Sequence, residues 1–139
     1  MYLHETKIRI RYGETDQMGY VYYGNYAQFF EIGRVEMLRA LGVSYASMEK
    51  QGIMLPVIDF SVKYIKAAHY DDLITIHTMI EEIPSVKIKF IYEIYNETKL
   101  LLTSAKTTLV FVKKDNMKPT NSPQELVAAL TAKLLENKR

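Results

Sequence analysis

The stretch from residue 11 to residue 41, RYGETDQMGYVYYGNYAQFFEIGRVEMLRAL, decides the fold. A loop with three glycines leads into the longest helical pattern of the chain, residues 25–41, which contains no proline and one glycine, Gly33. Its apolar residues recur at helical spacing and cover more than half of the circumference. That breadth predicts a helix enclosed by a curved sheet and touched by a second subunit.

The ends and faces of this helix follow from single residues. Asn25 with Gln28 three positions later is a capping-box pattern, and Gly42 is typical of a left-handed helix stop. The predicted core face comprises Ala27, Phe30, Met37, Leu38 and Leu41, with Phe29 and Gly33 at its edge. The predicted polar face comprises Gln28, Glu31, Arg34 and Arg39.

Composition favours a single soluble domain over residues 1–139, in the cytoplasm. The 139 residues are 48% apolar and 24% charged, a normal balance for a globular protein. The net charge of +2 is too small to favour nucleic acid. The chain has no cysteine, which excludes thiolate metal ligands and cysteine nucleophiles. No apolar run approaches the roughly 20 residues of a membrane span, and no signal peptide is evident.

The rest of the chain predicts a sheet. Alternating apolar residues predict strands over residues 6–12, 55–67, 73–83, 86–96 and 100–113. Helical signals cover residues 44–50 and 122–135. Short turns between the later strands predict that these strands pair as antiparallel neighbours. The expected class is therefore α+β, a curved antiparallel sheet wrapped around one long central helix, with a C-terminal helix.

Two stretches resemble a known enzyme family. RYGETDQMGYVYYGNYAQFFEIGRVEMLR and VIDFSVKYIKAAHYDDLITIHT are similar to the hotdog-fold acyl-CoA thioesterases of the 4-hydroxybenzoyl-CoA thioesterase and YbgC type. The chain departs from the pattern at two places. Tyr23 stands where many YbgC members carry histidine, and the coenzyme-binding loop of the 4-hydroxybenzoyl-CoA branch appears as residues 83–87, with Lys87 its one basic residue.

The resemblance implies hydrolysis of an acyl-CoA thioester to the free acid and coenzyme A. Asp16 would act as nucleophile or as general base, two roles that the sequence leaves open. The backbone N–H of Tyr23, at the electropositive helix start, would polarise the thioester carbonyl. The predicted substrate-binding residues are Gly19, Val21, Tyr22, Gly24, Asn25, Tyr26, Ser61 and Lys87.

Other readings stay open at this point. Aspartates in such turns commonly cap a loop, and Glu31 on the helix is a reserve catalytic carboxylate. The rival functions are a non-catalytic acyl-thioester binding module and a hotdog dehydratase of hydroxyacyl thioesters, for which the loop and helix lack a histidine. The three histidines have no metal-ligand spacing, so we expect neither a metal nor a cofactor apart from the coenzyme A of the substrate. The resemblance also implies a homodimer or a dimer of dimers.

Overall fold

The computed structural model describes residues 1–137. The strands are β1 (Tyr2–Arg9), β2 (Ile53–Met54), β3 (Val57–Tyr64), β4 (Leu73–Ile80), β5 (Lys87–Tyr95), β6 (Leu101–Val110) and β7 (Val112–Lys113). The helices are α1 (Tyr26–Ala40), α2 (Tyr45–Lys50) and α3 (Gln124–Asn137), with short 3₁₀ turns η1 (Tyr12–Glu14) and η2 (Tyr23–Asn25).

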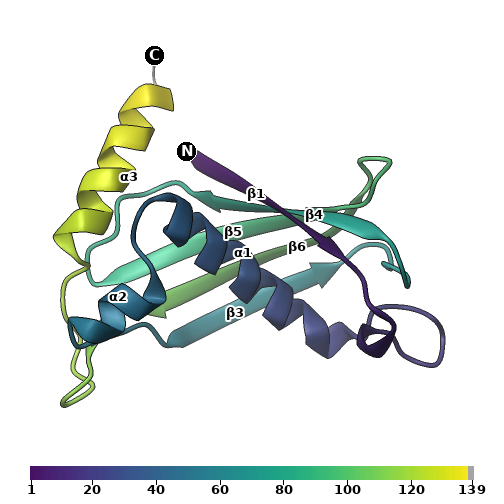
Figure 1. The fold of residues 1–139 in the computed structure, drawn as a ribbon, viewed down its shortest axis with the longest axis horizontal. Coiled ribbons are helices and arrows are strands. Elements are labelled where there is room, and N and C mark those ends of the chain that lie inside the picture. The colour runs from purple at the N-terminus through teal and green to yellow at the C-terminus, as the bar shows by residue number, and fades with distance from the viewer. Residues whose placement is uncertain (138–139) are drawn as a thin grey trace.

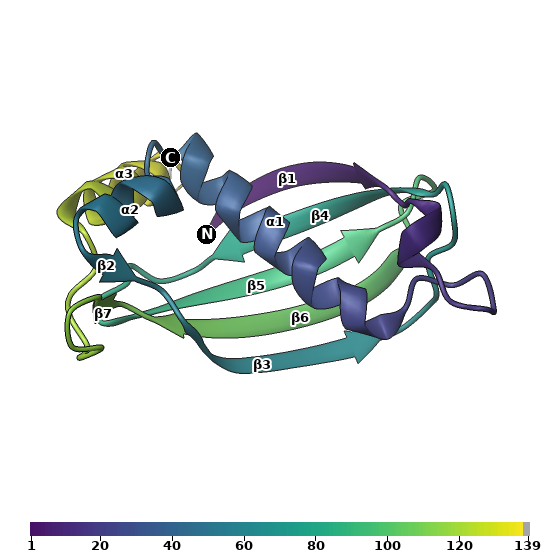
Figure 2. The same ribbon diagram turned by 60° about the horizontal axis from the view of Figure 1, so that its bottom comes forward.

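Five antiparallel strands form one curved sheet in the order β1-β4-β5-β6-β3. Helix α1 crosses the concave face of this sheet, and α3 lies at one end of it (Figures 1 and 2). This arrangement is the hotdog fold, and the predicted α+β class is confirmed. No helix within the described part of the chain has the length and apolar character that crossing a membrane requires.

The pairing of the later strands differs from the prediction. The hairpins β4–β5 and β5–β6 form as expected, but β3 pairs with β6, and β4 pairs with β1 instead. Burial explains the difference. Strand β4 is buried along much of its length, as an interior strand should be, whereas nearly all of β3 is exposed, as an edge strand can be.

The first strand covers residues 2–9 rather than 6–12. Tyr12 to Glu14 curl into the turn η1 instead, because the Glu14 side chain accepts a hydrogen bond from the Arg11 backbone N–H at 2.7 Å. The last predicted strand is divided into β6 and β7, and β7 pairs with β2, which the sequence did not predict.

The ends of α1 confirm one prediction and correct another. Gly42 has a φ of 84°, and the next N–H, that of Val43, reaches the Leu38 carbonyl at 2.9 Å, so the left-handed stop is confirmed. The predicted capping box is wrong, because the Asn25 side chain makes no cap hydrogen bond. Its Nδ2 donates to the Glu14 carbonyl at 2.8 Å and thereby ties the loop to the helix.

The buried face of α1 is rotated from the predicted one. It comprises Tyr26, Phe29, Phe30, Gly33, Arg34, Met37 and Leu38. Ala27, predicted in the core, is exposed, and Arg34, predicted on the polar face, is only 8% exposed. The helix lies so close to β4 that a Cβ at Gly33 would stand 2.5 Å from Thr78 Oγ1. This close approach fixes the spacing between the middle of α1 and β4.

Candidate active site

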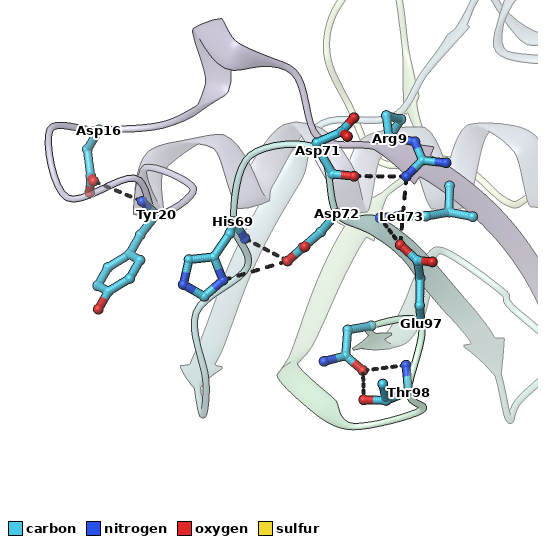
Figure 3. A network of polar contacts seen from close by, with 10 residues as sticks. Arg9, Asp16, Tyr20, His69, Asp71, Asp72, Leu73, Glu97 and Thr98 are labelled. Atoms are coloured by element: carbon cyan, nitrogen blue, oxygen red, sulfur yellow. Dashed lines mark hydrogen bonds and ion pairs between the residues drawn. The ribbon is translucent and has the colours of Figure 1, made fainter.

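Asp16 lies in a tight loop whose ends are joined by a β-bridge between Thr15 and Val21. Its backbone N–H donates to the Tyr20 carbonyl at 2.8 Å. The carboxylate Oδ1 accepts a hydrogen bond from the N–H group of Met18 at 2.9 Å. It also accepts one from the N–H group of Tyr20 at 3.3 Å (Figure 3). Asp16 is therefore a loop cap, and its side chain is half-buried and held in one orientation. Within residues 1–137, Oδ2 accepts no hydrogen bond.

Gly19 lets this loop turn back. Its φ is 79°, a left-handed conformation in which a side chain is strained, and its N–H donates to the Asp16 carbonyl at 3.0 Å. The loop therefore depends on Gly19 for its shape, although the residue does not line the groove described below.

The helical segment begins at Tyr23, three residues before α1 itself, as the 3₁₀ turn η2. First-turn N–H groups have no acceptor inside a helix. Within residues 1–137 the N–H groups of Tyr23 and Gly24 donate to no acceptor. The N–H group of Tyr22, by contrast, donates to the Glu14 carbonyl at 2.9 Å. Gly24 lets the Tyr22 ring pack against the backbone, because a Cβ at position 24 would stand 2.6 Å from that ring. The helix start thus presents free donors.

A groove of about 290 Å³ brings the loop and the helix start together. Asp16, Val21, Tyr23 and Tyr26 line it from this side, with Met18 and Tyr20. Tyr64, Ile65, Lys66 and Ala67, at and beyond the end of β3, line the opposite side. A carboxylate, unpaired backbone donors and apolar walls therefore share one depression at the surface.

Aromatic contacts hold the walls of the groove. The Tyr64 hydroxyl donates to the Tyr23 carbonyl at 3.1 Å, and the Tyr64 ring lies edge-on to Tyr26, with centroids 5.3 Å apart. Burial raises the pKa of Tyr26, although Thr103 and the Ala68 backbone lower it in part. Tyr26 is therefore a neutral wall of the groove at physiological pH. Tyr26 is 3% exposed and Tyr23 is 65% exposed.

Six predicted residues do not line the groove of this single chain: Gly19, Tyr22, Gly24, Asn25, Ser61 and Lys87. Ser61 is exposed on β3 and lines two hollows that it shares with Lys106. Lys87 is exposed at the first position of β5. Asn25 ties the loop to the helix, as described above. Glu31, the reserve carboxylate, is exposed on α1 and also stands outside the groove.

The sequence analysis missed the far wall of the groove. Tyr64 and Lys66 belong to the second stretch that carried the family resemblance, VIDFSVKYIKAAHYDD, but strand alternation alone does not show where the end of a strand lies. Lys66 is the cation of the groove. No sequence signal identified it, because the predicted strand ran to residue 67 and β3 ends at Tyr64.

A polar cluster braces the neighbouring turn. The backbone N–H of His69 donates to Asp72 Oδ2 at 2.8 Å, and the His69 ring meets Tyr20 edge-on at 5.0 Å (Figure 3). Tyr20 and His69 also form a β-bridge. Through its contacts with Tyr20, the turn at His69 packs against the Asp16 loop. In residues 1–137 no three His, Asp or Glu side chains gather as a metal site would require.

Comparison with known proteins decides the family. Residues 10–130 match the thioesterase-like superfamily. The chain belongs to this superfamily. It is 39% identical over 119 residues to a putative acyl-CoA thioesterase, YneP, of Bacillus subtilis, covering 86% of each chain. It is 32% identical to the acyl-CoA thioester hydrolase YbgC of Escherichia coli over 121 residues, covering 87% of this chain and 90% of YbgC.

A solved structure extends the likeness to three dimensions. The DHNA-CoA thioesterase of Staphylococcus aureus superposes with a TM-score of 0.92 at 38% identity, covering 99% of this chain and 95% of that one. The resemblance expected from the two sequence stretches is therefore confirmed at the level of family and fold.

Proposed function

We propose that this chain hydrolyses an acyl-CoA thioester to the free acid and coenzyme A. Its similarity to proteins named as acyl-CoA thioesterases supports the reaction class. One observation carries the assignment to residues: Asp16 and the start of the helical segment at Tyr23 line the same groove. The cytoplasmic location expected from the sequence stays a prediction.

In the proposed reaction the thioester carbonyl lies against the free N–H of Tyr23, which stabilises the negative charge that develops on the oxygen. Asp16 either attacks the carbonyl carbon and expels the coenzyme A thiolate, which gives a mixed anhydride that water then hydrolyses to the free acid, or it removes a proton from a water that attacks the carbonyl carbon directly. Because Oδ1 is already engaged by two N–H groups, the unpaired Oδ2 is the oxygen that acts. The cation of Lys66 suits the phosphates of the coenzyme, a role for which the sequence proposed Lys87.

A thiol-release assay over a panel of acyl-CoAs tests the reaction. We expect turnover by the wild type and its loss in Asp16→Asn, which keeps the size of the side chain and removes its charge. Asp115→Asn, an exposed position outside the groove, is the matched control and should keep full activity. A protein inert on every substrate, or an undiminished Asp16→Asn variant, would count against the proposal. Tight acyl-CoA binding without turnover, measured by calorimetry, would identify a binding module instead.

The Tyr23 N–H is testable because proline lacks this group. Tyr22 precedes it with a ψ of 130°, and position 23 opens a helical turn, so both positions accept an X-Pro pair. We expect Tyr23→Pro to lower kcat by about 10²–10³-fold, as the loss of an oxyanion donor does elsewhere. Tyr23→Phe keeps the backbone donor and should retain most of the activity. Equal activities in the two variants would remove the N–H from the mechanism.

Transfer of an oxygen of water into Asp16 distinguishes the nucleophilic route. In H₂¹⁸O, hydrolysis of an anhydride at the enzyme's carbonyl carbon leaves ¹⁸O in Asp16, which mass spectrometry of the Asp16 peptide detects. General-base catalysis places ¹⁸O in the product acid and leaves Asp16 unlabelled. Label in the peptide would therefore establish the nucleophilic route.

We also propose a homodimer joined through β3. This strand is an edge of the sheet, and it exposes apolar side chains: Val57 is 45% exposed, Ile58 51% and Phe60 40%. Such an edge favours pairing with a second copy. Phe60→Lys should reduce the mass measured by light scattering to that of a monomer. Leu3→Lys, on the opposite edge strand β1, should not. A wild type that is monomeric at micromolar concentration would contradict the dimer.

A further inference from the structure

The Asp16 loop repeats the hydrogen-bond pattern of the turn between β5 and β6. Asp16 Oδ1 accepts hydrogen bonds from the N–H groups two and four positions later. Asn96 Oδ1 accepts hydrogen bonds at the same two spacings, each at 3.0 Å. In both segments the backbone N–H of the first residue donates to the carbonyl four positions later, at 2.8 Å for Asp16 and at 3.1 Å for Asn96. The backbone at Asp16 therefore has the pattern of a hairpin turn.

The two segments differ in what holds them. The turn at Asn96 closes the hairpin of β5 and β6, two strands of nine and ten residues. The Asp16 loop is held by isolated β-bridges instead, one of which joins Tyr20 to His69. Residues 17–20 are all exposed, so burial contributes little to their order. The loop therefore depends on the neighbouring turn for a fixed shape.

His69 provides a side-chain contact to this loop. Its ring lies edge-on to the Tyr20 ring, with centroids 5.0 Å apart. The backbone of Tyr20 bonds to Asp16 twice, because its N–H donates to Oδ1 at 3.3 Å and its carbonyl accepts the Asp16 N–H at 2.8 Å. Val21 donates its N–H to the Ala68 carbonyl at 2.8 Å, so the end of the loop runs beside the same turn. Tyr20 thus links the His69 ring to the carboxylate of Asp16.

The turn at residues 69–72 is itself fixed to the core. The His69 N–H donates to Asp72 Oδ2 at 2.8 Å (Figure 3). The Asp72 carbonyl accepts the N–H of Ile10 at 2.8 Å, and Ile10 is only 1% exposed. Asp71 has a φ of 68°, a costly conformation that persists only where the surrounding structure holds it, and its N–H donates to the Ile10 carbonyl at 3.0 Å. His69 therefore projects from a well-anchored turn.

We propose that His69 is a positioning residue for Asp16. Its ring holds Tyr20 in place, and Tyr20 in turn keeps the carboxylate in the orientation in which it lines the groove. His69 itself does not line the groove, so it acts without touching the substrate. The effect on rate rests on the proposed hydrolysis, because displacing a reacting group by about 1 Å can cost about 10²-fold. The effect on the order of the loop does not depend on turnover.

Amide hydrogen exchange in the full chain tests the order of the loop. An edge-on aromatic pair stabilises a structure enough to shift an equilibrium by about 2–10-fold. We therefore expect His69→Ala, which removes the ring, to speed exchange of the Met18 and Tyr20 amides by about 2–10-fold. His69→Phe keeps a ring and should restore the wild-type rates. The Thr98 and Leu100 amides, which form the same pattern in the β5–β6 turn, are the internal reference and should not change.

The thiol-release assay tests the effect on rate. His69→Ala should lower kcat, by up to the same factor, with little change in KM, because the ring lies outside the groove. His69→Phe should recover kcat. His77→Ala is the matched control, because it removes another contact between a histidine and a tyrosine ring, that with Tyr95 at 4.9 Å. It should alter neither the loop amides nor turnover.

Three results would overturn the positioning role. The first is an exchange rate of the loop amides in His69→Ala that equals the wild-type rate, or that rises equally in the reference amides, which would show a general loss of stability. The second is a failure of His69→Phe to restore the loop. The third is an unchanged kcat in His69→Ala when the wild type is active. A wild type inert on every acyl-CoA would refute the proposed hydrolysis alone, and the amide rates would then decide whether His69 positions Asp16.

Discussion

Gly33→Ala tests how closely α1 packs on the sheet. The built Cβ would lie 2.5 Å from Thr78 Oγ1 and 3.0 Å from Ile76 Cγ2. Thr78 is fully buried on the interior strand β4, and its β-branched side chain has little rotamer freedom. Neither neighbour is the mobile end of a long side chain. The added methyl therefore has to displace the helix or the strand.

Two opposing effects set the magnitude. Alanine is favoured over glycine in a helix interior by about 1 kcal/mol. Overpacking a tight core costs about 1–3 kcal/mol. The contact of 2.5 Å is shorter than real Cβ contacts, so we take the upper half of this range, and the expected net loss is about 1–2 kcal/mol of unfolding free energy.

A double-mutant cycle isolates the contact. Thr78→Ala removes the hydroxyl that the new methyl would meet, so Gly33→Ala in that background should be close to neutral or slightly stabilising. Thr78→Val keeps the bulk and removes only the hydroxyl, so Gly33→Ala should remain destabilising there. Urea unfolding at one fixed protein concentration measures all variants. Two results would refute the close packing of α1 on β4. One is a stabilising effect of Gly33→Ala in the wild-type background, and the other is an equal effect of Gly33→Ala in the wild-type, Thr78→Ala and Thr78→Val backgrounds.

Two further predictions concern other parts of the fold. Gly42→Ala should destabilise the protein by about 1–2 kcal/mol, because a φ of 84° is strained for a residue with a side chain; urea unfolding measures it, and an unchanged midpoint would contradict the left-handed stop. Stability should fall as the pH rises above about 10, because burial raises the pKa of Tyr92 above its usual 10.0 and the folded state then holds a proton that the unfolded state has lost. Urea midpoints across this range should fall less steeply in Tyr92→Phe than in the exposed control Tyr12→Phe; equal slopes would contradict the assignment to Tyr92.

Local sequence signals determined a large part of the candidate site. The glycines of the loop, the aspartate Asp16 and the helix that follows are features of adjacent residues, and four of the predicted residues line one groove. Tyr64 and Lys66 join them only because β3 ends beside the helix start, which depends on how the sheet is assembled. Ser61 and Lys87 stand elsewhere on the single chain for the same reason.

The sequence by itself determined the helical and strand periodicities of the apolar residues, the stop of α1 at Gly42, and the β4–β5 and β5–β6 hairpins. Each of these features depends on residues that are close along the chain. Only the tertiary structure decided that β1 lies beside β4, that β3 is an edge, and that Arg34 is buried against Tyr45. Periodicity states which residues share a face of a helix or strand. Which face becomes covered depends on the free energy of contacts between distant segments, and no local pattern contains that information.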